Sequence, residues 1–271
     1  MTNSPIPSIR EKLYAVRMLP WEMLPPLMLI LTLGIFVQAS AGFAAGLLTI
    51  PLLLWSGYGI PEAQAALLVA TIPQNLIGVW AFREHVLPRE LAFPASLRLA
   101  ALPLGAYLLV SLESLPKSQI HQVVGAVVFL VTLGIIVMRP QPRHSLPIGW
   151  AWLAFSSSGF LQGLVGMGGP MMVLWIQAHD WDTKKTRAFL FAMYLVSMLP
   201  ALLILWLLFG NRILAAGLST LLLVPWLLAV TWAGLHVGTW LGRARLRTLT
   251  LGMLLLIGLA GVCSPWLKGE G

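Results

Sequence analysis

The chain has 271 residues, of which 58% are hydrophobic and only 10% are charged, and its mean hydropathy is +0.86. Soluble domains carry about 25% charged residues, so this composition excludes an ordinary soluble protein and indicates an integral membrane protein. The net charge of +8 comes from bases that lie mostly between apolar runs. We therefore assign them to membrane orientation and anionic lipid rather than to nucleic acid. The single cysteine, Cys263, excludes a disulfide within one chain.

Eight apolar segments follow one another along the chain. About 20 apolar residues span a bilayer as a helix, and by this measure the segments are 24–55, 62–82, 92–112, 120–138, 148–178, 186–209, 213–237 and 246–267. The sequence therefore predicts an all-α membrane protein with about eight transmembrane helices in a single domain over residues 1–271. A proline-rich polar linker, 139–147, divides it into halves of about 24–138 and 148–267.

The first and fifth segments are too long for one straight crossing, and each contains a glycine-rich interruption. In the fifth, Gly166, Gly168 and Gly169 precede Pro170. Glycine permits unusual backbone angles, and proline removes an N–H group and clashes with the preceding turn. Backbone groups freed in this way must find partners within the protein or face a water-filled cavity. A broken helix with Gln162 one turn before the break is typical of a transporter's binding site.

The two halves resemble a duplicated unit. Both broken segments read Phe-x-Gln-x-x-x-Gly, and a shift of 124 residues aligns Phe36, Gln38 and Gly42 with Phe160, Gln162 and Gly166. If the chain crosses eight times, the bases of the first half obey the positive-inside rule, whereas Lys184, Lys185 and Arg187 fall on the outer side. Opposite orientation of the halves is the pattern of an inverted-topology repeat. Reconciling both halves requires one segment that enters the membrane and returns, and the fifth is the first candidate.

The two breaks also predict how an anion is held. Where a helix restarts, its first N–H groups are unpaired and its dipole end is positive. Two such ends, near Gly46 and Gly169, can face one site at mid-membrane and bind an anion without a buried cation. Gln38 and Gln162, one turn before the breaks, each offer an amide donor. Interhelical hydrogen bonding is the alternative role for each glutamine, but their matched placement favours the site.

Further polar side chains complete the set of candidate substrate-binding residues. Gln74 and Asn75 are side-chain amides at mid-span and must find partners, whereas Ser197 is a weaker candidate because serine can bond its own helix carbonyls. Arg98, the only basic residue well inside a segment, can attract an anion or extend to the lipid head groups, and its depth favours the second role. The full set is Gln38, Gly42, Gly46, Gln74, Asn75, Gln162, Gly166, Gly168, Gly169 and Ser197.

The glycine-rich run 159–170, its counterpart at 36–51, the length and the eight segments resemble the sulfite exporter TauE/SafE family. The resemblance implies a bacterial inner-membrane permease for a small sulfur-containing or organic anion, such as sulfite, sulfoacetate or another sulfonate. The chain departs from the family pattern at Pro170, where a third glycine is usual, and at Trp175, where the motif commonly closes on proline. The first half also lacks a Gly-Gly pair. These departures bear on the substrate more than on the fold.

Transport is the function that these features favour: a secondary transporter for a small inorganic or organic anion, working by alternating access. Coupling to proton, sodium or the membrane potential stays open, as do import, export and a homodimer. We expect no cofactor, no metal and no nucleic-acid partner, with membrane lipid around the helices. An intramembrane enzyme is less favoured, because no Ser/His pair, aspartate pair or His/Glu metal motif has usable spacing. A non-transporting membrane scaffold is the remaining alternative.

Overall fold

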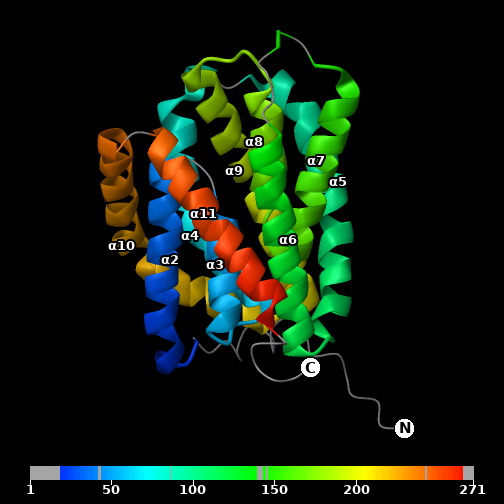
Figure 1. Cartoon of the computed structure of the whole chain (residues 1–271), viewed down its shortest axis with the longest axis vertical. Coiled ribbons are helices and arrows are strands. Elements are labelled where there is room, and N and C mark those ends of the chain that lie inside the picture. Colours follow the sequence, from blue (N-terminus) through cyan, green and yellow to red (C-terminus); the bar gives the residue numbers. More distant parts are fainter. Residues whose placement is uncertain are drawn as a thin grey trace.

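The computed structural model describes residues 19–41, 44–85, 87–138, 143–144, 146–241 and 243–264. These residues form a bundle of α-helices (Figure 1). Its helices are α2 (Leu24–Ala41), α3 (Ala45–Trp55), α4 (Ile60–Ala81), α5 (Pro88–Glu113), α6 (Lys117–Val137), α7 (Ile148–Val165), α8 (Gly169–Gln177), α9 (Thr183–Phe209), α10 (Asn211–Leu241) and α11 (Arg243–Val262), with short 3-10 helices η1 (Trp21–Met23) and η2 (Arg83–His85).

Six helical stretches of the described residues are long and apolar enough to cross a membrane. They are Trp21–Ser40, Ile60–Ala81, Pro88–Glu113, Lys117–Val137, Thr183–Phe209 and Asn211–Val237. The predicted all-α, multi-pass membrane protein is thus confirmed, with six such stretches in place of the eight expected. The difference arises because the break divides the fifth segment into α7 and α8, and because the last segment contributes only the shorter apolar helix Thr248–Val262.

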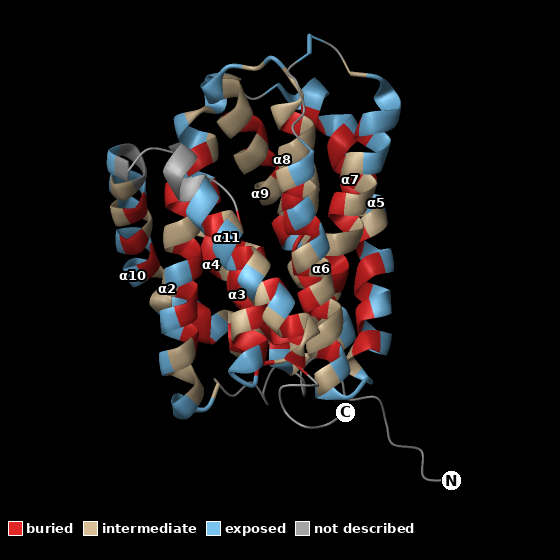
Figure 2. Cartoon of the chain, in the orientation of Figure 1, coloured by how far each residue is buried: buried red, intermediate tan, exposed pale blue. Residues whose placement is uncertain are grey.

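The burial pattern fits a bundle surrounded by lipid. Residues facing the inside of the bundle are buried, whereas the outer helix faces are exposed (Figure 2). The exposed outer residues include many large apolar side chains, among them Leu104, Leu199, Leu207, Leu222 and Trp240. Lipid tails are as apolar as leucine, so such a surface carries no penalty within a membrane.

The first broken segment is a hairpin. α3 starts after Ala44, whose φ of 84° is left-handed, and then packs against α2. The Tyr58 hydroxyl, just beyond α3, donates a hydrogen bond to the Met23 carbonyl, just before α2. The segment therefore returns to the end of the bundle at which it started, which we call the lower end after its place in Figure 1.

The fifth segment is a second hairpin, which starts from the opposite, upper end. Gly166, with a φ of 70°, ends α7 before α8 turns back. Phe155 of α7 packs edge-on against Trp175 of α8, with ring centres 4.9 Å apart. Arg143, in the linker before α7, exchanges backbone hydrogen bonds with the residues just after α8. The fifth segment, the candidate for a non-crossing segment, thus returns as expected.

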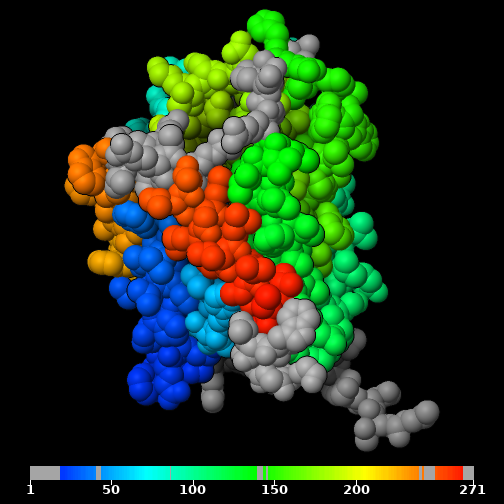
Figure 3. Space-filling model, viewed as in Figure 1, coloured from blue at the N-terminus to red at the C-terminus, as the bar shows by residue number. Residues whose placement is uncertain are grey.

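The remaining helices run between the two ends. At the lower end, the start of α4 meets the end of α5, where the Ile60 N–H donates to Glu113 at 3.2 Å. At the upper end, the start of α5 meets the start of α9, where Lys185 pairs with Glu90 at 2.8 Å. α11 descends across the face between α2 and α6 (Figure 3) and ends beside the start of α6.

These directions differ from the eight crossings on which the predicted charge distribution was based. The first segment was expected to cross, but it returns to the lower end, as the fifth returns to the upper end. Most of the described basic residues of both halves therefore lie towards one end of the bundle. Among the described residues, the upper end carries Arg83, Arg89, Arg143, Lys184, Lys185 and Arg187, and α11 begins there with Arg243, Arg245 and Arg247.

Close packing of α5 against α7 sets the position of the second hairpin. The two helices run in the same direction, and glycines on both let their backbones touch. A Cβ on Gly159 would lie 2.1 Å from the Arg98 carbonyl oxygen, and one on Gly105 would lie 2.1 Å from the Phe160 carbonyl oxygen. No residue larger than glycine fits either position without moving a helix.

Candidate functional site

The two helix breaks meet inside the bundle. Gly46, in the first turn of α3, lies so close to the second break that a Cβ on it would be 2.7 Å from the Gly166 carbonyl oxygen. Both α3 and α8 begin there without a side-chain cap. The first N–H groups of a helix have no partner within the helix, so each start presents positive backbone dipoles.

A small cavity of about 60 Å³, the central chamber, lies at this junction. It has room for a few water molecules or one small oxyanion, since one water needs roughly 10–15 Å³ on this measure. The starts of α3 and α8 line the chamber together with residues of α2, α4, α5, α7 and α9. Of the predicted site residues, it is lined by Gln38, Gly46, Asn75, Gln162, Gly166, Gly169 and Ser197.

Arg98 of α5 also lines the chamber, and only 1% of it is exposed. One guanidinium nitrogen, Nη1, donates to the Ser158 hydroxyl and, at 3.5 Å, to the Gly168 carbonyl. The other, Nη2, lies 3.4 Å from Gln162 Oε1. The guanidinium carbon lies 5.9 Å from the centre of the Tyr194 ring, within the range of a cation–π contact.

No carboxylate balances this charge in the part of the chain that the structure describes. The ion pairs among those residues join Lys185 to Glu90, and Arg212 to Glu62 and Glu113. The Arg98 Nε is buried without a hydrogen-bond partner. A buried ion costs several kcal/mol unless it is paired, by an approximate estimate. The positive charge of Arg98 is therefore not neutralised by any described residue, and the site favours a negatively charged ligand.

The prediction that Arg98 extends to the lipid head groups is wrong, and so is the inference that the site lacks a buried cation. At Gly159, α7 packs directly on the backbone of Arg98. The Arg98 side chain therefore extends along α7 to Ser158, inside the bundle, and not outward to the lipid. The sequence did contain a signal. Arg98 lies on the stripe that α5 buries, which includes Leu91, Ala95, Leu102, Gly105 and Leu109, and charged residues within spans usually face the protein interior.

The predicted amides differ in their surroundings. Asn75 is 1% exposed; its Nδ2 lies 3.5 Å from the Met198 sulfur, and its Oδ1 is buried without a partner. Gln162 accepts from Arg98, so it helps to hold the cation. Ser197 donates to the Met193 carbonyl, the local bond that made it the weaker candidate.

Two other predicted residues, Gly168 and Gln74, lie outside the lining of the chamber. Gly168 places its carbonyl against Arg98 and accepts a 2.5 Å hydrogen bond from the Ser158 hydroxyl. Gln74 lines a larger neighbouring cavity, where its Oε1 is buried without a partner. Gly42 lies outside the described residues.

Gln64 of α4 supports the second break and was not predicted. It is 1% exposed and its Nε2 lies 3.5 Å from the Gly163 carbonyl. With its amide turned over, it donates to the Gln162 carbonyl at 3.2 Å and accepts from the Gly166 N–H at 3.1 Å. Nothing in the local sequence distinguishes this glutamine, because its partners come from a helix nearly one hundred residues away.

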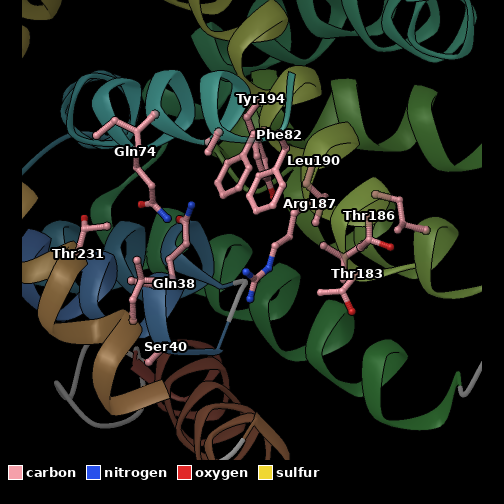
Figure 4. Close-up of a pocket in the computed structure, with 18 of the residues that line it drawn as sticks. Gln38, Ser40, Gln74, Phe82, Thr183, Thr186, Arg187, Leu190, Tyr194 and Thr231 are labelled. Carbon is pink, nitrogen blue, oxygen red and sulfur yellow. The ribbon is translucent and has the colours of Figure 1, made fainter. Parts of the chain in front are cut away.

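The larger neighbour, the outer cavity, has a volume of about 580 Å³ and lies towards the upper end. It is lined by the ends of α2, α4 and α8 and by the start of α9. Gln38 and Tyr194 line both the outer cavity and the central chamber. In Figure 4 the amide ends of Gln38 and Gln74 point toward one another, and Arg187 extends toward the same space.

At the lower end, ion pairs hold helices together below the chamber. Arg212 at the start of α10 pairs with Glu62 of α4 and, at 3.2 Å, with Glu113 at the end of α5. Glu113 also accepts from the Ile60 N–H, so one cluster ties three helices together below the chamber. Within the described residues, no group of His, Cys, Asp and Glu has the arrangement of a metal site.

Comparison with known proteins identifies the family. The family model described as Sulfite exporter TauE/SafE matches residues 27–261, which include nearly all of the first hairpin, the whole second hairpin, Arg98 and every described residue of the chamber lining. No curated protein and no solved structure gives a significant match. The matched region covers most of the chain. The sulfite exporter TauE/SafE family is a family of membrane transport proteins. The chain therefore belongs to the sulfite exporter TauE/SafE family.

Proposed function

We propose that this protein is a secondary transporter that moves a small oxyanion, sulfite or a compact organosulfonate, across the inner membrane of a bacterium. The observation that carries the proposal is the buried Arg98 guanidinium beside the central chamber, with no carboxylate partner among the described residues. A bound anion would supply the missing negative charge. A guanidinium has a planar fork of N–H donors that matches the oxygens of such an anion.

The helix starts support the same ligand. First-turn residues of both α3 and α8 line the chamber, and both helix starts lack a side-chain cap. Helix starts bind anions through these unpaired N–H groups and the positive dipole end. The chamber volume of about 60 Å³ favours a compact oxyanion group over a bulky ligand. We propose Asn75 as the residue that orients the bound anion, because it lines the chamber from α4 and carries an amide donor.

We also propose that the halves form an inverted repeat. The first hairpin, from the lower end, is followed by α4, α5 and α6; the second, from the upper end, is followed by α9, α10 and α11 in opposite directions. Each hairpin packs on the other half's equivalent helix: α2 on α10, and α7 on α5. Equivalent contacts recur, since Gly234 lies against the Phe36 carbonyl as Gly105 lies against that of Phe160.

Such a repeat supports alternating access. The outer cavity approaches the chamber from the upper end, whereas the Glu62–Arg212–Glu113 cluster ties the helices of the lower end. Exchange of the two halves' conformations would separate that cluster and close the outer cavity, which would present the chamber to the other side. We propose that the bound anion favours this exchange because it neutralises Arg98.

The test is anion flux into liposomes that contain the purified protein. Wild type is expected to take up labelled sulfite under a pH gradient, a sodium gradient or a membrane potential, and Arg98→Gln to lose at least about 90% of this flux. Arg98→Lys keeps the charge but loses the planar fork, so we expect a partial rate. Lys117→Gln removes one exposed base at the lower end, away from the chamber, and is the control expected to transport normally.

Normal abundance and a monodisperse elution profile must accompany the loss in Arg98→Gln. A scaffold protein would retain its biological effect in this variant and show no flux in wild type. If wild type moves none of sulfite, sulfate, sulfoacetate or simple carboxylates under any gradient, the proposed function is wrong. Equal flux in Arg98→Gln and wild type would leave transport standing but remove Arg98 from the site.

A further inference from the structure

The outer cavity has charge chemistry of its own. Arg187 is the only charged residue among the described residues that line it, and no carboxylate is among them. A cavity of about 580 Å³ lies within the range of small-molecule sites, roughly 300–1,000 Å³. The Arg187 side chain is half-buried, and it extends into the cavity in Figure 4.

Two hydroxyl groups accompany this cation. Thr183, Thr186 and Arg187 all line the cavity, and their spacing of three and four residues places them on one face of the first turns of α9. A guanidinium and neighbouring hydroxyls offer several donors to the oxygens of one anion. In Figure 4 Thr183 and Thr186 lie beside each other next to Arg187.

Tyr194 lies between this group and the central chamber. It follows Arg187 by seven residues on α9, which is about two helical turns on the same face. Its ring contacts Arg98, and its hydroxyl rests on Gly169 so closely that a Cβ there would be 2.5 Å away. Tyr194 lines both cavities. It therefore lies between Arg98, which lines the central chamber, and Arg187, which lines the outer cavity.

We propose that the outer cavity holds a second anion-binding site, formed by Arg187, Thr183 and Thr186, which takes the oxyanion before it passes Tyr194 to reach Arg98. This proposal rests on the proposed function, because the outer site serves the same anion. Two sites along one path allow the anion to enter the buried site stepwise. An anion at Arg187 also raises the local concentration at the entrance to the chamber.

The test is equilibrium binding of ³⁵S-labelled sulfite, and of sulfate as a second probe, to the purified full-length protein in detergent. We expect two bound anions per chain in wild type, one in Arg187→Gln, one in Arg98→Gln and none in the double variant. Arg187→Lys is expected to keep two. Lys184→Gln is the matched control, since Lys184 adjoins the site in sequence but does not line the cavity, and should also keep two.

The liposome assay gives a second measurement. Arg187→Gln is expected to raise the KM for sulfite by about tenfold with a smaller change in maximal rate, the loss expected for one charge-assisted hydrogen bond. One bound anion per chain in wild type that is lost in Arg98→Gln and kept in Arg187→Gln would overturn the outer site alone. Absence of binding of either anion to wild type would overturn the inner and outer sites together.

Discussion

A single residue, Arg98, determines what the centre of this protein can bind. It is fully enclosed, it carries a charge, and its hydrogen bonds go to a hydroxyl, an amide oxygen and a carbonyl, all uncharged acceptors. Such partners satisfy donors but do not neutralise charge. A residue kept for stability alone would be better served by a neutral side chain, because burial of an unpaired ion opposes folding.

This reasoning predicts that function and stability separate at this position. Arg98→Met, of similar length but neutral, is expected to lose transport while its thermal midpoint in anion-free buffer stays equal to wild type or rises. Sulfite is expected to raise the midpoint of wild type and to leave that of Arg98→Met unchanged, because a ligand stabilises only the protein that binds it. Thermal unfolding in detergent measures both. A large drop in the anion-free midpoint of Arg98→Met would assign Arg98 a structural role.

The sequence predicted the parts of this site that depend on local chemistry. Closely spaced glycines, with a proline after them in the fifth segment, weaken a helix through the backbone itself, so the breaks near Gly46 and Gly169 could be located from the residues alone. The direction of the Arg98 side chain could not, because it depends on α7 touching α5 at Gly159, which brings together residues sixty positions apart. Gln64 was missed for the same reason, since its partners belong to the other half of the chain.

At the scale of the element, the contact between α5 and α7 joins fold and site. Three glycines, Gly105, Gly159 and Gly163, let the helices approach until backbone meets backbone. Arg98 lies within this contact, and its own carbonyl faces Gly159. A change that separates the helices therefore also moves the guanidinium away from the chamber.

Gly159→Ala is expected to lower the free energy of unfolding by about 1–3 kcal/mol, the usual effect of overpacking, and to reduce anion flux. The added Cβ would be 2.1 Å from a backbone oxygen, which cannot move aside as a side chain can. Gly134→Ala in α6 is the matched control: nothing lies within 4 Å of the added carbon. There we expect a gain of about 0.5–1 kcal/mol from helix propensity. Thermal midpoints that move equally in both variants would contradict this account of the contact.

At the scale of the whole molecule, the two hairpins decide which charges share a side of the membrane. From the charge pattern we expected one segment to enter the membrane and return, with the fifth as the first candidate. The hydrogen bonds of Tyr58 with Met23 and of Arg143 with the residues after α8 show that both broken segments return. The direction of return depends on contacts between ends distant in sequence, so periodicity and composition could not supply it.

The bases gathered at the upper end predict that this end faces the cytoplasm, because basic residues near span ends favour that side. Single cysteines introduced in a Cys263→Ser background test this in intact bacterial cells, with a membrane-impermeant maleimide as the label. Glu22→Cys and Ser56→Cys flank the first hairpin, and Arg143→Cys and Lys184→Cys flank the second; all four positions are exposed.

We expect Glu22→Cys and Ser56→Cys to react in intact cells, and Arg143→Cys and Lys184→Cys to react only after the membrane is permeabilised. Agreement within each pair follows from the return of each hairpin to its own end, and opposition between the pairs follows from the two hairpins entering from opposite ends. If Glu22→Cys and Ser56→Cys label from different sides, the first segment crosses the membrane; if Arg143→Cys and Lys184→Cys do, the fifth crosses. If each pair agrees but the sides are exchanged, the hairpins stand and the outer cavity opens to the periplasm, which would make Arg187 the receiving site for import rather than export.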